Sequence, residues 1–261
     1  MEMQDSDGVI QRLRIVTDPQ EIQEICGDFA QRKLYIADGH HRYETALNFR
    51  DDCRKQGIAK EGDAVDYVMM MLVDMENSGL VVFPTHRLVR GLSSFDESAV
   101  KEACRDYFLV EDRADVSTIE GELNALYQQG KKAFAFYTGK DRWTLLVLKD
   151  MDAVRKLLPQ ASAATQGLDV TVLHSLVLEK IFGIDKENMA QQINLTYTRD
   201  FQEAITSVEK KESQCAFILN PTRVTEIRDV AAAGEKMPQK STYFYPKLIT
   251  GLVMNQMEKG Q

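Results

Sequence analysis

The sequence predicts a mixed α/β fold (α+β) in which helices and strands alternate along the chain. Short apolar runs with strand character are separated by segments whose apolar residues recur every three to four positions. Two of these runs, residues 133–137 and 143–148, are joined by Gly139-Lys140-Asp141 and therefore predict a hairpin. The length of 261 residues is enough for one large domain or two small ones with a real core.

Residues 1–92 are expected to form a first region, whose elements follow from local signals. Residues 9–16 predict a strand, and Thr17-Asp18-Pro19 predicts a helix start, because a capping side chain precedes a proline. This helix is expected to present one apolar face: Ile22, Ile25, Cys26 and Phe29. Residues 34–37 predict a short buried strand. A helix over 40–55 follows, with these residues toward the core: Tyr43, Ala46, Leu47 and Phe49. Strands are expected over 66–74 and 79–83, with Met69-Met70-Met71 as core packing.

A change of composition after Pro84 and the polar run from Ser93 to Glu97 predict a boundary near residue 93. Residues 93–261 are therefore expected to form a second mixed α/β region. Helices are expected over 97–108, 116–129, 151–158, 169–182, 199–211 and 222–233. Strands are expected near 108–111, in the hairpin, near 193–197, at 216–219 and at 248–254.

Charge and composition exclude several classes of function. The formal net charge of −8 argues against a protein that binds nucleic acid through bulk electrostatics. The four cysteines lie far apart without a CxxC pair, which indicates reduced thiols in a cytoplasmic protein. The first residues lack a signal-peptide pattern, and no run approaches the roughly 18 apolar residues that a membrane span needs. We expect a soluble cytoplasmic protein with no membrane partner.

The strongest chemical signal lies in residues 34–47, where a buried strand, a glycine turn and a helix start are predicted in succession. A helix start offers unpaired N–H groups and the positive end of the dipole, and both favour an anion. Gly39 lets the backbone approach a ligand closely, and Arg42 carries a forked donor suited to phosphate or carboxylate. Asp38 follows the strand, where it is a candidate general base or Mg²⁺ ligand.

His40 and His41 complete this turn as candidate catalytic groups. Adjacent helical residues point about 100° apart, so the pair is a poor match for one transition-metal ion. In the alternative interpretation Asp38 only caps the helix, Arg42 pairs with Asp38 or Glu44, and the histidines are solvated. Because two of the four histidines and an arginine share one turn, the functional interpretation is favoured.

Two further segments are candidates for phosphate binding. His86 and Arg87 follow the predicted strand 79–83 and would complete an anion site, or else lie in an exposed loop. A second, proline-flanked loop offers an ammonium group and two hydroxyls, from Lys240, Ser241 and Thr242. It lacks the glycines and the following helix of a Walker site, and its alternative role is a docking loop with aromatic residues in the core. His174, on an apolar helix, is interpreted as a satisfied structural histidine.

The segment LYIADGHHRYETAL (residues 34–47) resembles the bacterial and archaeal family called domain of unknown function 1015. The resemblance continues through residues 84–87, 168–184 and 237–248. Members are usually longer at the amino end, so the resemblance implies that this chain corresponds to the carboxy-terminal part of such a protein.

The segment Gly39-His40-His41-Arg42 is also similar to the phosphate-holding turns of sulfiredoxin and ParB-type proteins, a fold shared with free serine kinases. His40 stands where sulfiredoxin has its nucleophilic cysteine, which rules out sulfinic-acid reduction. The ParB/sulfiredoxin-like likeness implies a phosphate-binding region over residues 1–92 and nucleotide binding.

Together these observations predict a nucleotide-dependent phosphotransferase, kinase-like, that acts on a small hydroxylated metabolite such as serine, or a nucleotide hydrolase. ATP or ADP is the expected co-substrate, with Mg²⁺ as cofactor. Two alternatives stay open: a non-enzymatic, ParB-like nucleotide-binding module, and a truncated family member without activity. A homo-oligomer is also considered, because strand 9–16 would present an open edge to another chain.

Overall fold

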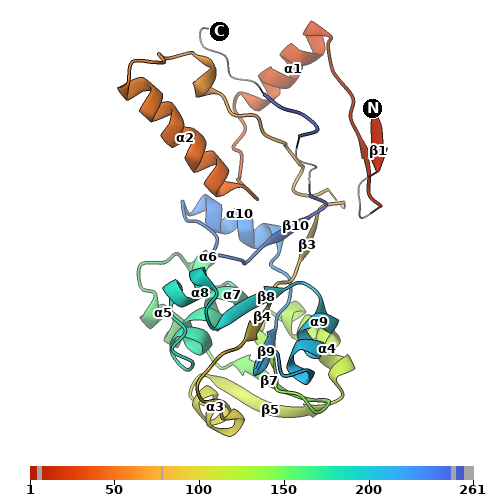
Figure 1. The fold of residues 1–261 in the computed structure, drawn as a ribbon, viewed down its shortest axis with the longest axis vertical. Coiled ribbons are helices and arrows are strands. Elements are labelled where there is room, and N and C mark those ends of the chain that lie inside the picture. Colours follow the sequence, from red (N-terminus) through yellow and green to blue (C-terminus); the bar gives the residue numbers. More distant parts are fainter. Residues whose placement is uncertain (5–7, 78, 248–250, 256–261) are drawn as a thin grey trace. The chain divides into compact units, whose positions relative to one another are not determined.

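The computed structural model describes residues 1–4, 8–77, 79–247 and 251–255, and it is a mixed α/β fold as the sequence predicts (Figure 1). Its backbone forms two compact units. We call residues 1–81 with 244–261 the terminal unit, and residues 82–243 the sheet unit. The division after residue 92 that the sequence predicts stays a prediction about folding regions.

The terminal unit contains short strands and two longer helices. Its elements are β1 (Glu2–Gln4), β2 (Ile10–Arg12), α1 (Pro19–Phe29), α2 (His40–Lys55) and a 3₁₀ turn (Ala64–Asp66). β1 pairs with β2 in antiparallel fashion. A further two-stranded sheet, β3 (Val81–Phe83) with β10 (Tyr243–Tyr245), lies where the chain passes between the units.

The sequence predicts correctly where both long helices of this unit begin. Asp18 accepts a hydrogen bond from the Gln20 N–H at 2.8 Å and Pro19 opens α1, which confirms the predicted start. The bounds of α2, His40–Lys55, match the predicted helix over 40–55.

The apolar residues of the terminal unit are less buried than the sequence predicts. Ile22, Ile25 and Phe29 of α1 are exposed, as are Tyr43 and Phe49 of α2. Among the described residues of this unit, the buried apolar side chains are those of Cys53 and Phe244. The prediction of a core-facing side is therefore wrong for α1 and holds only in part for α2, where Ala46 and Leu47 are half-buried.

Two strands predicted in this unit are absent from the described residues. Residues 34–37 and 67–74 follow an extended or irregular path without ladder partners, and the methionine run 69–71 is about half exposed. An apolar run becomes a strand only when a neighbour satisfies its backbone groups. The predicted strand 9–16 shortens to β2 for the same reason. Of the predicted strand 248–254, residues 248–250 lie outside the described residues and 251–254 contain no strand.

The sheet unit is built on a six-stranded antiparallel sheet with the order β5-β7-β6-β9-β4-β8. The strands are β4 (His86–Val89), β5 (Phe108–Ala114), β6 (Ala133–Tyr137), β7 (Arg142–Leu148), β8 (Leu195–Thr198) and β9 (Cys215–Ile218). β6 and β7 form the predicted hairpin. Lys140 and Asp141 of its turn have positive φ values of 67° and 51°.

Helices connect these strands. They are α3 (Glu97–Cys104), a 3₁₀ turn (Val116–Thr118), α4 (Ile119–Gln128), α5 (Asp152–Leu157), α6 (Ala163–Gln166), α7 (Asp169–Val172), α8 (Lys186–Gln191), α9 (Phe201–Glu209) and α10 (Val224–Ala232). The predicted helix 169–182 begins as α7 and continues as a π-helix over Leu173–Glu179. None of the helices in the described residues has the length and apolar character that crossing a membrane requires.

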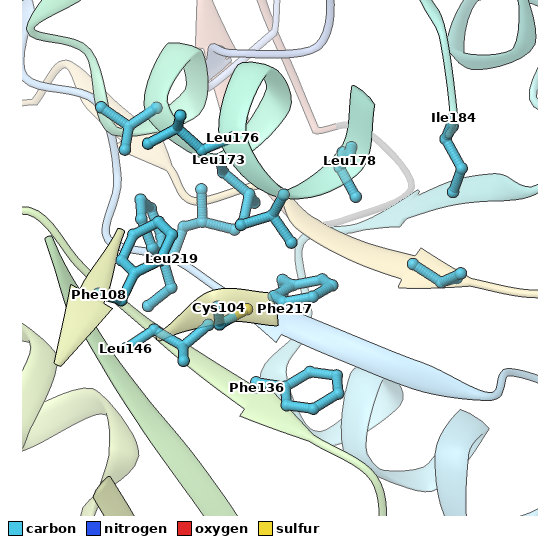
Figure 2. Close-up of a cluster of buried hydrophobic side chains, with 14 of the residues drawn as sticks. Cys104, Phe108, Phe136, Leu146, Leu173, Leu176, Leu178, Ile184, Phe217 and Leu219 are labelled. Carbon is cyan, nitrogen blue, oxygen red and sulfur yellow. The ribbon is translucent and has the colours of Figure 1, made fainter. Parts of the chain in front are cut away.

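Both faces of the sheet are covered, and the four inner strands, β7, β6, β9 and β4, contribute to two apolar clusters. On one face Phe136, Leu146 and Phe217 pack against the π-helix (Figure 2). The phenyl rings of Phe136 and Phe217 stack with centroids 5.1 Å apart. On the other face Ala135 and Leu145 belong to a second cluster, together with residues of α4 and α9. Alternate residues of one strand thus point into opposite clusters, as strand geometry requires.

Candidate functional site

The predicted glycine turn forms the start of α2. Gly39 is the N-cap residue and adopts a left-handed conformation with φ of 90° and ψ of 24°. A Cβ atom at this position would lie 2.9 Å from Arg42 Nη2, the end of an exposed and flexible side chain, so it is the positive φ that favours glycine here. The guanidinium of Arg42 therefore lies close to the Gly39 backbone.

The first N–H groups of this helix are available to a ligand. The first intrahelical hydrogen bond runs from the Tyr43 N–H to the Gly39 carbonyl at 3.0 Å. Among the described residues, no side chain caps this end of α2. The N–H groups of the first turn consequently offer both donors and the positive end of a 16-residue helix dipole.

Asp38 lies between two cations. Lys247 Nζ donates to Asp38 Oδ2 at 2.7 Å, and Arg42 Nη2 lies 3.6 Å from the same oxygen. Burial raises the pKa of Asp38, but the hydrogen bond and charge of Lys247 and the charge of Arg42 outweigh it and lower the pKa overall. Asp38 is thus an ionised carboxylate at neutral pH.

The two histidines of the turn differ in exposure. His40 is half-buried. The side chain of His41 is 99% exposed, and its Nδ1 lies 3.6 Å from Glu44 Oε2. The part of the alternative interpretation that pairs Arg42 with Asp38 also holds geometrically, so the turn combines an ion pair with an uncapped helix start.

His86 and Arg87 lie inside the sheet unit rather than in a loop. Both belong to β4, which pairs with β8 and β9, and each is 1% exposed. The interpretation of this segment as an exposed loop is therefore wrong. The apolar residues that follow, Leu88 and Val89, place β4 in the core of the sheet, and this burial carries the two polar residues inside with them.

The two neighbours point to opposite faces of the sheet. His86 Nδ1 accepts a hydrogen bond from the Leu219 N–H at 3.3 Å, and its ring meets Phe201 edge to face. Burial, together with the charge of Arg87, lowers the pKa of His86 to about 4. His86 is therefore neutral at physiological pH.

Arg87 is held by neutral groups. Its Nε donates to His174 Nε2 at 3.3 Å, its Nη1 donates to the Thr85 carbonyl, and its Nη2 donates to the Lys240 carbonyl at 3.1 Å. Its guanidinium also lies 5.6 Å from the ring centroid of Tyr197, the opposite residue on β8. Burial lowers the pKa of Arg87 to about 10. His174 has the hydrogen-bond partner that its interpretation as a satisfied histidine requires.

The proline-flanked loop uses its hydroxyls internally. Ser241 is buried and its Oγ donates to the Pro238 carbonyl at 2.6 Å, while Thr222 Oγ1 donates to the Ser241 carbonyl at 2.9 Å. Lys240 adopts a positive φ of 56°. Thr242 is half-buried. The Ser241 hydroxyl, which the sequence assigns to a phosphate, thus already has a partner within the loop.

The sequence-predicted site residues fall into two groups. Asp38, Gly39, His40, His41 and Arg42 belong to the terminal unit, where Lys247 joins them. The others belong to the sheet unit: His86, Arg87, Lys240, Ser241 and Thr242. A cavity of about 460 Å³ in the sheet unit is lined by residues of β4, β8 and α9 and by nearby chain, and none of the predicted site residues lines it.

Residues 1–171, more than half of the chain, match the family described as protein of unknown function (DUF1015). The chain belongs to this family. No curated protein matches it.

Among solved structures, a conserved hypothetical protein from Pyrococcus furiosus is 16% identical to this DUF1015 member, with a TM-score of 0.43 over 86% of this chain and 81% of that chain. Free serine kinase in complex with AMP is 15% identical, with a TM-score of 0.45 over 88% of this chain and 81% of that chain. A variant of free serine kinase in complex with ADP is 13% identical, with a TM-score of 0.44 over the same shares.

Sequence reasoning about this DUF1015 member missed two contacts that complete the two groups, and it missed the burial of Thr171. Lys247 pairs with Asp38 although 209 positions separate them, and neither spacing nor composition links the two. Tyr197 contacts Arg87 only because β8 pairs with β4. Thr171 is buried one helical turn before His174, and its apolar neighbours in sequence were the only available sign of that burial.

Proposed function

We propose that this chain binds a nucleotide through the turn Asp38–Arg42 and acts in phosphoryl transfer. Its activity is that of a phosphotransferase for a small hydroxylated metabolite, or of a nucleotide hydrolase. One observation carries the proposal: the uncapped start of α2 behind a left-handed glycine, with Arg42 and Lys247 beside it. Unpaired N–H groups, a helix dipole and two cations in one place favour a multiply charged anion.

The phosphates of ATP or ADP accept hydrogen bonds from the N–H groups of the first turn of α2. Gly39 adopts the left-handed conformation that this turn needs and carries no side chain that would cover the N–H groups. Arg42, whose side chain is 82% exposed, is free to turn from Asp38 toward a phosphate oxygen. An exposed ion pair at 3.6 Å is weak enough to be exchanged for a charge-assisted bond to phosphate.

Asp38 acts as the general base. Its lowered pKa keeps it ionised, so it accepts the proton of the acceptor hydroxyl while the hydroxyl oxygen bonds to the terminal phosphorus. The bond from that phosphorus to the bridging oxygen breaks at the same time, and the shortened nucleotide leaves. With water as acceptor the same step is hydrolysis. His40 and His41 stand beside the turn and stabilise developing negative charge.

Mg²⁺ fits this arrangement only with help from the nucleotide. Among the described residues no cluster of three or more metal-binding side chains exists. Mg²⁺ commonly uses one or two carboxylates and completes its shell with phosphate oxygens and water. Asp38 would be the protein ligand, and the ion would neutralise phosphate charge.

A binding module without turnover is the second candidate, and the Asp38–Lys247 pair favours it. A carboxylate already bonded to an ammonium group at 2.7 Å is a poorer base than a free one. The two candidates differ in phosphate release, so a phosphate-release or transfer assay with serine as acceptor separates them. The choice of serine follows the resemblance of the turn to that of free serine kinases.

A thermal-shift screen tests nucleotide binding directly. The chain is heated with ATP, ADP, CTP, GTP or pyrophosphate, with and without Mg²⁺, beside two variants. Arg42→Ala removes the guanidinium at the turn. Arg50→Ala removes one from the same helix that pairs with Asp51 away from the turn, and serves as the matched control.

A ligand at a hundred times its dissociation constant stabilises the folded state by about 2.7 kcal/mol. We expect a rise in melting temperature with at least one nucleotide that Arg42→Ala abolishes and Arg50→Ala retains. The absence of any rise with every ligand, or a rise that Arg42→Ala leaves unchanged, would overturn the assignment of the nucleotide to this turn.

A further inference from the structure

We infer that the buried guanidinium of Arg87, together with Thr171, forms a second anion site in the sheet unit, specific for a small oxyanion such as the carboxylate of an organic acid. The inference does not rest on phosphoryl transfer. The inference comes from two observations: a buried cation without an anionic partner, and a buried hydroxyl without any partner.

The first observation is the charge of Arg87. The residue is 1% exposed, and its pKa of about 10 leaves it protonated at neutral pH. Within the described residues its hydrogen-bond partners are two carbonyls and an imidazole, and no carboxylate forms an ion pair with it. A buried guanidinium is costly unless it is paired, because dipoles compensate a full charge only partly.

The ionisable side chains that contact Arg87 are those of His174 and Tyr197, and both are uncharged at neutral pH. The charge of Arg87, in addition to burial, lowers the pKa of His174 well below its usual value, so the imidazole stays neutral and accepts the Nε hydrogen bond. The phenol of Tyr197, whose pKa burial raises, is neutral as well. The positive charge of Arg87 is therefore not compensated by a carboxylate among its hydrogen-bond partners, and it is available to an anion.

Hydrogen-bonding capacity remains on the guanidinium. Arginine carries five N–H hydrogens, and three are directed to the Thr85 carbonyl, the Lys240 carbonyl and His174. One hydrogen on Nη1 and one on Nη2 are left over. Two parallel donors on a planar fork match the two oxygens of a carboxylate.

The second observation is independent of the first. Thr171 is 6% exposed, and its Oγ1 has no hydrogen-bond partner among the described residues. It lies three residues before His174, which accepts the Nε hydrogen bond of Arg87, and the helix changes from α to π at Leu173 between them. In the proposed site this hydroxyl joins the guanidinium, and an oxyanion would satisfy both.

The loop that carries Lys240 covers one side of the Arg87 guanidinium. The Lys240 carbonyl is one of the groups that cover the guanidinium, at 3.1 Å from Nη2. Its residue has a positive φ of 56°, unusual for a side chain with a Cβ atom, and belongs to a segment without regular secondary structure. We assign the Lys240 carbonyl as the group that a bound oxyanion replaces, exchanging a dipole for a charge.

The experiment measures thermal stability of the full chain in chloride buffer and then with sodium acetate, lactate or inorganic phosphate at matched ionic strength. The two carboxylates and phosphate distinguish the chemical source of the oxyanion. Three variants are compared. Arg87→Lys keeps the charge but removes the fork, Arg87→Met removes the charge with little change in volume, and Thr171→Val removes only the hydroxyl.

We expect at least one oxyanion to raise the melting temperature of the wild type in a saturable way. The apparent affinity should fall about tenfold or more in Arg87→Lys and Thr171→Val, because a charge-assisted or otherwise unmade hydrogen bond is lost. Arg42→Ala should keep the response, which separates this site from the nucleotide site. Arg87→Met should lose the response, and without added anion it should melt lower than the wild type, because the Thr85 and Lys240 carbonyls and the His174 imidazole lose their donor.

Two results would overturn the inference. One is the absence of a saturable response to every oxyanion in the wild type. The other is a response of unchanged affinity in Arg87→Lys and Thr171→Val, which would place the anion elsewhere. If Arg87→Met does not fold, Thr171→Val still decides, because valine has the shape of threonine and an unsatisfied hydroxyl contributes nothing to stability.

Discussion

The buried imidazole of His86 makes the stability of the sheet unit depend on pH, and the size of the effect follows from its surroundings. His86 is 1% exposed, and burial with the charge of Arg87 lowers its pKa from 6.5 to about 4. The unfolded chain, with a pKa near 6.5, therefore binds a proton that the folded chain refuses between pH 6.5 and pH 4. The free energy of unfolding is therefore unaffected by His86 well above pH 6.5, and it falls as the pH drops from 6.5 toward 4.

The magnitude comes from the ratio of the two protonation equilibria. Protonation of His86 makes the unfolding equilibrium constant at pH 5 about 30 times larger than at high pH, which lowers the free energy of unfolding by about 2 kcal/mol. His86→Asn tests this value, because asparagine keeps an acceptor near the position of Nδ1 for the Leu219 N–H but does not titrate. Urea unfolding at pH 7 and pH 5, followed by the fluorescence of the single tryptophan Trp143, gives the free energy of unfolding in each case.

The wild type should lose about 2 kcal/mol more than His86→Asn between the two pH values. His41→Asn, a substitution of the same kind at a side chain that is 99% exposed, is the matched control. His174 titrates in the same direction in both proteins and cancels from the comparison. An equal loss of stability in wild type and His86→Asn would refute the argument that burial of His86 sets the pH dependence.

Three further predictions follow from burial. Phe217→Ala should reduce the free energy of unfolding by about 3–5 kcal/mol in urea titrations, because the ring is fully buried against Phe136, and a loss below 1 kcal/mol would contradict that packing. Cys26 is exposed while the other three cysteines are buried, so one thiol should react rapidly with a disulfide reagent and none in Cys26→Ser; fast reaction of a second thiol would be inconsistent. The homo-oligomer stays a prediction, and if the free edge of β2 mediates it, Ile10→Lys should lower the mass seen by light scattering at high concentration, whereas an unchanged mass would exclude that edge.

The fold of residues 97–218 follows closely from the sequence, because local pattern and tertiary partner agree there. The hairpin of β6 and β7 has both apolar runs and turn residues, and each strand finds a neighbour on both sides. The run 66–74 has equally strong strand character but no neighbour among the described residues, and it does not form a strand. Strand propensity is a statement about packing on a sheet, so it fails where no sheet is at hand.

The candidate site was predictable only where it is local. The turn at Gly39 and the start of α2 are encoded in consecutive residues, and the structure has them where the sequence indicates. The partners of the charged groups are not local: Lys247 reaches Asp38, and Lys240 reaches Arg87 across 153 positions. The burial of Arg87 itself was hidden, because a polar residue between strands is ordinarily exposed.

The exposure of the turn separates its contribution to binding from its contribution to stability. The side chains of Asp38, Arg42 and Lys247 are 53%, 82% and 39% exposed, and ion pairs of this kind contribute about 0–1 kcal/mol. These charges therefore contribute almost nothing to the free energy of unfolding. Arg87 presents the reverse case, since its burial makes the guanidinium costly in the absence of an anion. The two proposed ligands would therefore act differently: one would bind exposed charges, and the other would compensate a buried one.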